Sequence, residues 1–154
     1  MACSLLEAKQ IISTDLEDII TSNTNQNIIY NTTKHKLTFP NLTLLPLEWS
    51  NNSHLNNLLQ NIPSNNKLDY IIICECLYLE APFDKLLKTM LSLSEHYPYA
   101  DILFAYKKRY IYQEQCIETL NKYYTIAELP RNEYHVEFKN KINYILLNLK
   151  YIKP

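Results

Sequence analysis

The stretch Leu68-Asp69-Tyr70-Ile71-Ile72-Ile73-Cys74 is an almost unbroken run of apolar residues. Such a run is typical of a strand in a sheet whose two faces are both covered by helices. Pro82 follows it and suits the first turn of a helix. Apolar residues then recur at helical spacing up to about residue 95, namely Phe83, Leu86, Leu87, Met90, Leu91 and Leu93. This strand–helix order predicts an α/β fold.

Further strands and helices alternate on both sides of this run. We predict strands over residues 9–14, 42–47, 101–106, 124–129 and 142–149, and helices over residues 16–30 and 113–123. Residues 50–67 are rich in Asn and Ser, which favours a connection with at most a helical turn at residues 55–59. Asn140 between the last two strands favours a turn and antiparallel pairing. The pattern predicts one domain over residues 1–154, with a mostly parallel sheet and antiparallel C-terminal strands.

The chain of 154 residues contains no glycine, whereas average usage would give roughly 11. This absence excludes collagen, glycine-rich linkers and glycine-rich phosphate loops within the sequence. Turns and helix ends that need a left-handed backbone must then use another residue type. We expect the abundant asparagines to occupy these positions.

The charge and hydropathy of the chain exclude several classes of partner. The net charge of -1 gives no basic surface for nucleic acid or for a membrane. No apolar run approaches the ~18 residues that span a bilayer, and the first residues lack the basic region of a signal peptide. We therefore expect a monomer in the cytoplasm, or also in the nucleus, with no nucleic-acid or membrane partner.

The four cysteines are expected to be reduced thiols, because a chain of this size needs no disulfide framework. Cys74 and Cys76 would share one face of a strand, but no second ligand pair stands at zinc spacing. We therefore predict no metal site.

Three strand ends carry distinctive side chains, and ligands of open α/β sheets bind at such carboxyl ends. Asp15 either accepts hydrogen bonds from a ribose or caps the following helix. Trp49, the only tryptophan, either lies against an adenine ring or belongs to the core. Glu75 follows a very apolar strand, where it either meets a cation or donor group or caps the next loop.

The chain carries further motifs beside these strand ends, in the same order along the sequence. They are Thr14-Asp15-Leu16-Glu17 with Asn23 and Asn27, Leu47-Glu48-Trp49, Glu75-Cys76-Leu77-Tyr78-Leu79-Glu80 with Phe83 and Leu86-Leu87-Lys88-Thr89, and Ala105-Tyr106-Lys107-Lys108-Arg109-Tyr110. Over about residues 1–130 this set resembles methyltransferase family 16. That family has a Rossmann-like sheet of seven strands and uses S-adenosyl-L-methionine. Within the family the chain is most similar to the protein-lysine methyltransferases that include the valosin-containing-protein lysine methyltransferase.

The resemblance implies a role for each candidate residue. Asp15 and the adjoining Leu16 would hold the cofactor ribose, Trp49 would flank the adenine, and Cys74 would stand where the family has a small residue at the cofactor. Glu75 and Tyr78 occupy the Asp-x-x-Tyr signature that lines the opening for the target lysine, with Glu in place of Asp. The extra methylene moves the carboxylate oxygens by about 1 Å, which matters for positioning. The implied partner is a protein that presents a lysine side chain, such as a chaperone or an ATPase.

The glycine loop of dinucleotide-type folds precedes the acidic residue by about 20 residues, and counting back from Asp15 passes Met1. We therefore expect an N-terminally truncated methyltransferase or gene-model fragment, which lacks the first strand and the glycine loop and binds the cofactor weakly or not at all. Two alternatives stay open. One is a non-catalytic methyltransferase-like binding module. The other is a methyltransferase for small molecules or nucleic acid, and the near-neutral charge disfavours the nucleic-acid version.

Overall fold

The computed structural model describes residue 3 and residues 6–62, 68–78 and 82–152. Its contacts group into two compact units, Met1–Pro63 and Ser64–Pro154, and each unit is described by itself. Strands pair both in parallel and antiparallel, as the predicted mixed α/β class requires. None of the helices in the described part is long and apolar enough to cross a membrane.

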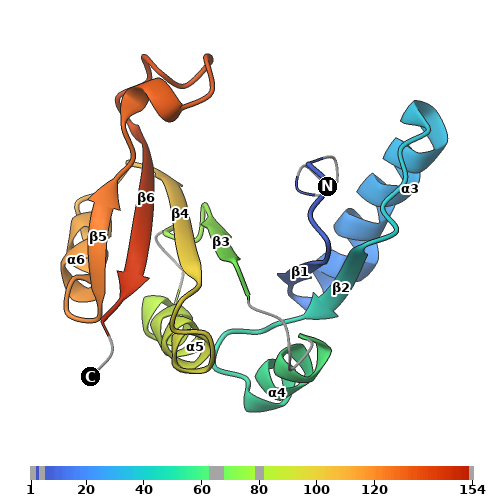
Figure 1. Ribbon diagram of the computed structural model, residues 1–154, viewed down its shortest axis with the longest axis horizontal. Helices are drawn as coiled ribbons and strands as arrows, with labels where there is room; N and C mark the ends of the chain where they lie inside the picture. Colours follow the sequence, from blue (N-terminus) through green and yellow to red (C-terminus); the bar gives the residue numbers. More distant parts are fainter. Residues whose placement is uncertain (1–2, 4–5, 63–67, 79–81, 153–154) are drawn as a thin grey trace. The chain divides into compact units, whose positions relative to one another are not determined.

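The first unit is built on two parallel strands, β1 (Ile11–Asp15) and β2 (Leu42–Pro46) (Figure 1). Asp15 stands opposite Pro46 in the register. The pairing continues one step beyond β2, because the Leu47 N–H donates to the Asp15 carbonyl at 2.8 Å. Both strands were predicted, and their parallel pairing brings their carboxyl ends to one edge.

The segment between β1 and β2 is helical: α2 (Glu17–Ile19), the wide turn η1 (Ile20–Thr24) and α3 (Asn25–His35). The Thr21 and Ser22 hydroxyls donate back to the carbonyls of Glu17 and Asp18, at 2.9 and 2.6 Å. Such bonds compete with the regular helical pattern, which accounts for a π-type turn here. The predicted helix is therefore confirmed, but with an internal irregularity.

Helix α4 (Asn52–Asn61) occupies the segment predicted to be mostly a connection, so that prediction was wrong. The Asn51 side-chain oxygen accepts hydrogen bonds from the backbone N–H groups of Ser53 and His54, at 3.1 and 3.2 Å. This is N-terminal capping, which satisfies donors that the first helical turn leaves free. Leu58 and the following Ile62 are buried. An Asn-rich segment with a good cap and apolar residues at helical spacing thus forms a helix.

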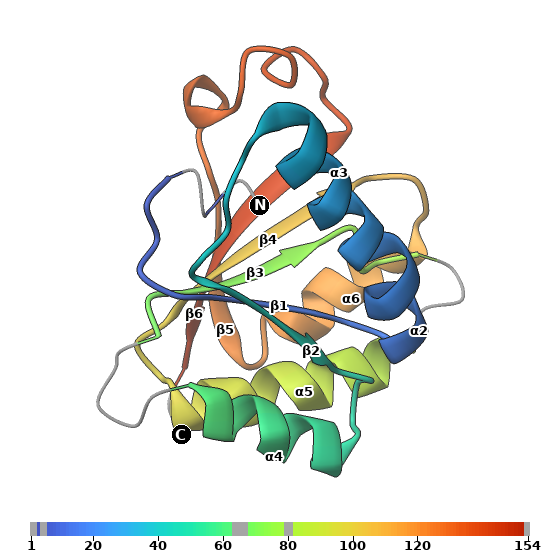
Figure 2. The same cartoon turned by 90° about the vertical axis from the view of Figure 1, so that its right-hand side faces the viewer.

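The second unit contains a four-stranded sheet in the order β3-β4-β6-β5 (Figure 2). Its strands are β3 (Tyr70–Cys74), β4 (Asp101–Lys107), β5 (Tyr124–Glu128) and β6 (Tyr144–Tyr151). β3 and β4 are parallel, and β6 is antiparallel to both β4 and β5. The predicted antiparallel ending is confirmed, and β6 inserts between β4 and β5.

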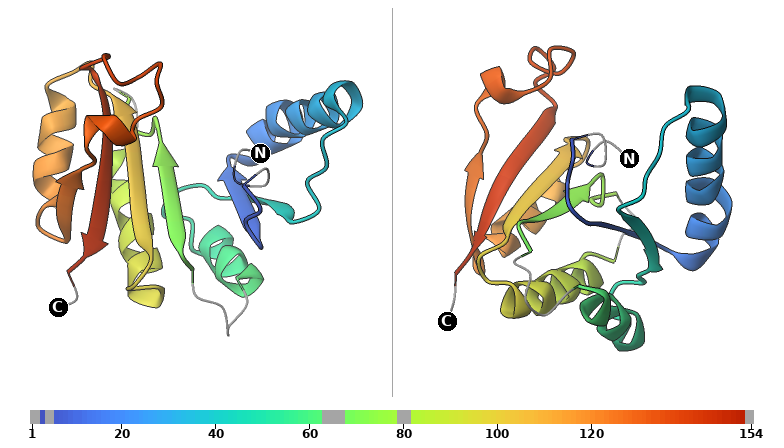
Figure 3. Two further views of the ribbon diagram at one scale, coloured as in Figure 1. Left: turned by 45° about the horizontal axis from the view of Figure 1, so that its top comes forward. Right: turned by 45° about the vertical axis from the view of Figure 1, so that its right-hand side comes forward.

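Helices α5 (Phe83–His96) and α6 (Tyr112–Leu120) lie on one face of this sheet (Figures 1 and 3). The core includes side chains that are at most 1% exposed, namely Met90, Ile102, Phe104, Leu120 and Leu149. On β3, Ile73 is buried, whereas Tyr70 and Ile72 are 57% and 56% exposed. The described helices of the second unit lie on one face of its sheet, so the cover of both faces of this strand stays a prediction.

Positive backbone φ angles occur at Glu7, Lys36, Ser50 and Glu75 among the described residues. None of these is an asparagine, so the expectation that asparagines take the left-handed positions was wrong. Lys36 ends α3 in this conformation, where a glycine would be usual. Residues other than glycine thus adopt the left-handed conformation in this chain. Glu75 is the clearest case, because its side chain contacts Lys107 and Arg109.

Candidate functional site

Asp15 is the last residue of β1 and is exposed. Its Oδ1 accepts a hydrogen bond from the Leu16 N–H at 2.8 Å. The N-cap of α2 is Leu16, which makes no side-chain capping bond, so Asp15 does not act as the cap. A carboxylate has about four acceptor sites, and Asp15 therefore keeps acceptor capacity for a ligand. Leu16 is 48% exposed beside it.

Trp49 follows β2 and is half-buried. The short segment that joins β2 to α4 and contains Trp49 is held by two hydrogen bonds of Glu48. The Glu48 N–H donates to His54 Nδ1 at 3.1 Å, and Asn51 Nδ2 donates to Glu48 Oε2 at 3.3 Å. Because β1 and β2 are parallel, Asp15 and the segment that contains Trp49 lie at the same edge of the first unit.

Glu75 begins the loop after β3 in the second unit, with a φ of 57°. Its N–H donates to the Ala105 carbonyl at 2.8 Å and so continues the pairing with β4. Its carboxylate turns to the end of β4: Oε1 accepts from the Lys107 N–H at 2.6 Å, and Oε2 pairs with Arg109 Nη1 at 2.7 Å. The carboxylate thus meets a cation and a donor, and through these two contacts it holds the loop that follows β4.

Gln113 is a site-organising residue that the sequence analysis missed. Its side chain is 1% exposed. Oε1 accepts from the N–H groups of Arg109 and Tyr110, at 2.7 and 3.2 Å. Nε2 donates to the carbonyls of Leu77 and Lys107, at 2.6 and 3.2 Å. One buried amide thus joins the loops that follow β3 and β4.

A signal for Gln113 was present in the sequence. Gln113, Cys116 and Leu120 are spaced three and four residues apart, and all three are buried on α6. A polar residue on the buried side of a helix must find hydrogen-bond partners. The pattern therefore marks Gln113 as a residue that holds neighbouring backbone.

Cys74 and Tyr78 flank the Glu75 loop, and both are exposed. Burial and the neighbouring Glu75 charge raise the pKa of Cys74, so this side chain is a neutral thiol. Tyr78 is 46% exposed and contributes, after burial and Cys116, to raising the pKa of Tyr112 to about 12. The predicted motif continues through Leu79 and Glu80, which lie outside the described residues.

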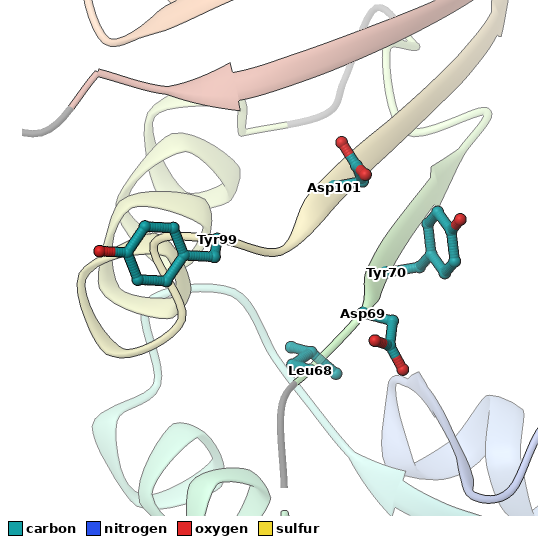
Figure 4. Close-up of a pocket in the computed structure, with 5 residues that line it drawn as sticks. All are labelled: Leu68, Asp69, Tyr70, Tyr99 and Asp101. Atoms are coloured by element: carbon teal, nitrogen blue, oxygen red, sulfur yellow. The ribbon is translucent and has the colours of Figure 1, made fainter.

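A cavity of about 290 Å³ opens at the other end of this sheet, lined by Leu68, Asp69, Tyr70, Tyr99 and Asp101 (Figure 4). It lies at the amino ends of β3 and β4, opposite the end that carries Glu75. Asp101 is also paired with Lys150. The cavity is therefore separate from the candidate site. The described residues contain no cluster of three or more His, Cys, Asp or Glu that could hold a metal ion.

The family model described as lysine methyltransferase, methyltransferase family 16, matches residues 1–123. The chain belongs to this family. The match contains all the candidate residues, from Asp15 and Leu16 through Trp49 to Cys74, Glu75 and Tyr78. No curated protein matches the chain significantly.

Proposed function

We propose that the chain is an S-adenosyl-L-methionine-dependent protein-lysine N-methyltransferase. The observation that carries the proposal is the placement of Glu75 directly after β3 in a chain of the lysine methyltransferase family. The proposed substrate is a protein, such as a chaperone or an ATPase, in the cytoplasm or nucleus, and the enzyme acts on it as a monomer.

Side chains at the ends of three strands suit the proposed cofactor. Asp15 offers an exposed carboxylate to ribose hydroxyls, and Leu16 adds apolar surface beside it. Trp49 offers an aromatic ring for the adenine. The small neutral thiol of Cys74 would lie against the cofactor without adding charge. When bound, S-adenosyl-L-methionine supplies an electrophilic methyl group, which only a neutral lysine amine can accept.

Glu75 would receive the target lysine. Its two oxygens accept one backbone N–H and one guanidinium N–H in the structure, and a carboxylate has about four acceptor sites. It therefore retains acceptor capacity for an amine N–H. Tyr78, exposed on the same loop, would border the opening for the lysine chain. The chain's contribution is thus to position the amine and to orient its lone pair.

A second candidate function is a non-catalytic methyltransferase-like binding module. The observation that favours it is the ion pair between Glu75 and Arg109, which already compensates the carboxylate charge within the chain. Only the methyltransferase would transfer a methyl group, whereas both candidate functions allow the cofactor to bind.

Trp49 provides a direct test of cofactor binding, because it is the only tryptophan in the chain. We expect S-adenosyl-L-methionine to change its fluorescence on titration. Asp15→Asn should weaken this binding by about 10- to 100-fold, since charge-assisted hydrogen bonds contribute roughly 1.5–3 kcal/mol. Asp18→Asn, in the exposed first turn of the following helix, is the matched control and should bind like the wild type. Equal binding by Asp15→Asn and the wild type would contradict the role of Asp15, and no response of the wild type would contradict cofactor binding by this chain.

A further inference from the structure

The Glu75–Arg109 ion pair joins the loops after β3 and β4. The Oε2–Nη1 distance is 2.7 Å, and the two side chains are 41% and 39% exposed. Solvent at this exposure weakens the attraction, so the pair contributes little to stability. The ion pair matters more for groups that approach Glu75 than for stability. The Arg109 guanidinium places a fixed positive charge beside the carboxylate, and any approaching group meets this charge.

The backbone around this pair is held by buried hydrogen bonds. Gln113 uses both acceptor sites and both donor sites of its amide, on Arg109, Tyr110, Leu77 and Lys107. Lys107 in turn donates its N–H to Glu75. These hydrogen bonds fix the backbone of Arg109 and the Oε1 atom of Glu75. They therefore hold the guanidinium and the carboxylate in defined positions.

Among the described residues, Arg109 is the cation that pairs with Glu75. On β3 the neighbour is the Cys74 thiol, whose pKa is raised by burial and by Glu75. After β4, the Lys107 ammonium lies over the Tyr144 ring, 5.4 Å from its centroid. Lys108 pairs with Glu114 of α6 at 2.5 Å. The other titratable groups of α6 on this side are Tyr112 and Cys116, and burial raises the pKa of each.

We propose that Arg109 is a positioning residue that makes Glu75 accept the target lysine as a neutral amine rather than as an ammonium ion. This inference rests on the proposed function. A lone carboxylate would stabilise the ammonium form of a lysine, which is unreactive and already dominates at neutral pH. A guanidinium beside the carboxylate opposes that form, because like charges disfavour each other. Glu75 is then an oriented hydrogen-bond acceptor whose charge is already compensated.

The first test measures binding and needs no methyl transfer. The probe is a fluorescent peptide with one lysine among alanine and serine residues, titrated by anisotropy at neutral pH. Arg109→Gln should bind it about tenfold more tightly than the wild type, since a nearby unit charge shifts such an equilibrium by about one pKa unit. The same peptide with glutamine in place of lysine should show no gain. Adding Glu75→Gln to Arg109→Gln should abolish the gain.

The second test is the pH profile of kcat for methylation of the same peptide at saturating concentration, because kcat reports ionisation within the enzyme–peptide complex. Arg109→Gln should shift the acid limb to higher pH by about one unit, which lowers the rate near neutral pH about tenfold and restores it near pH 9. Arg109→Lys keeps the charge and should retain most of the wild-type profile. Lys108→Gln is the matched control, because it removes an adjacent charge that pairs with Glu114, and its profile should match the wild type.

These outcomes separate the inference from the proposed function. A variant that merely fails to fold binds more weakly and does not recover its rate at high pH. If the wild type methylates lysine but Arg109→Gln neither binds more tightly nor shifts the profile, the role of Arg109 is wrong and the function stands. If the wild type neither binds the lysine peptide nor methylates it at any pH, the proposed function and the inference both fail.

Discussion

Glu75 combines an unfavourable backbone with a functional side chain. Its φ of 57° lies in the left-handed region, which costs roughly 1–2 kcal/mol for a residue with a Cβ. The conformation turns the chain out of β3, and the side chain contacts the Lys107 N–H and Arg109. Strain of this kind clusters at functional sites, where position matters more than stability.

Substitution of Glu75 should separate stability from function. Glu75→Gly removes the left-handed strain, whereas Glu75→Ala keeps it, and both lose the side-chain contacts with Lys107 and Arg109. We expect Glu75→Gly to be more stable than Glu75→Ala by about 1 kcal/mol in urea unfolding. Neither variant should support lysine methylation. A glycine variant that is less stable than the alanine variant would show that the backbone of Glu75 is not strained.

At the scale of elements, the second unit joins α5 to β5 through a buried hydroxyl pair. The Ser94 and Tyr124 hydroxyls lie 3.1 Å apart, and both residues are 1% exposed. Burial raises the pKa of Tyr124 to about 12, although its bond to Ser94 acts in the opposite direction. The phenol is therefore neutral in the folded protein at physiological pH.

This raised pKa predicts a loss of stability in alkali. The unfolded phenol ionises near about pH 10, while the folded one keeps its proton to about pH 12. The folded state then binds more protons than the unfolded state between these values, so the free energy of unfolding falls as the pH rises. Tyr124→Phe should make this fall shallower in urea unfolding, and should cost about 1 kcal/mol below pH 10 for the lost hydrogen bond.

Tyr123→Phe is the control for this pair, because Tyr123 is adjacent in sequence but 38% exposed. It should leave the alkaline slope unchanged. An equal slope in Tyr124→Phe and the wild type would mean that Tyr124 does not govern the alkaline transition.

The elements that could be predicted from sequence are those with a local signal. The apolar runs of β3 and β4 and the helical stripe of α5 carry their own periodicity. The helix α4 was missed, because the cap formed by Asn51 outweighs the loop-like composition. The position of β6 between β4 and β5 depends on pairing between distant segments, which no local pattern encodes.

The same distinction applies to the candidate site. The placement of Asp15, Trp49 and Glu75 at the ends of strands could be predicted from the strand patterns, whereas their roles in a site stay predictions. The contacts of Glu75 with Lys107 and Arg109 could not, since they join residues from different strand–loop segments. The fourfold bonding of Gln113 likewise depends on the folded chain, although its place on a buried helical face was a usable signal.

At the scale of the whole molecule, the family match extends across both compact units. The family assignment therefore belongs to the chain rather than to either unit. The described strands form a parallel pair in one unit and a mixed four-stranded sheet in the other. The single domain and the seven-strand sheet stay predictions.

The most direct test of the proposed lysine methylation is transfer of a deuterated methyl group from S-adenosyl-L-methionine, with the purified chain added to a cell lysate and the products read by mass spectrometry. We predict labelled lysine side chains in one or a few proteins, with the label lost in Glu75→Gln and kept in Lys108→Gln. Label that appears only in nucleic acid or small molecules, or in no lysine at all, would contradict a protein-lysine methyltransferase.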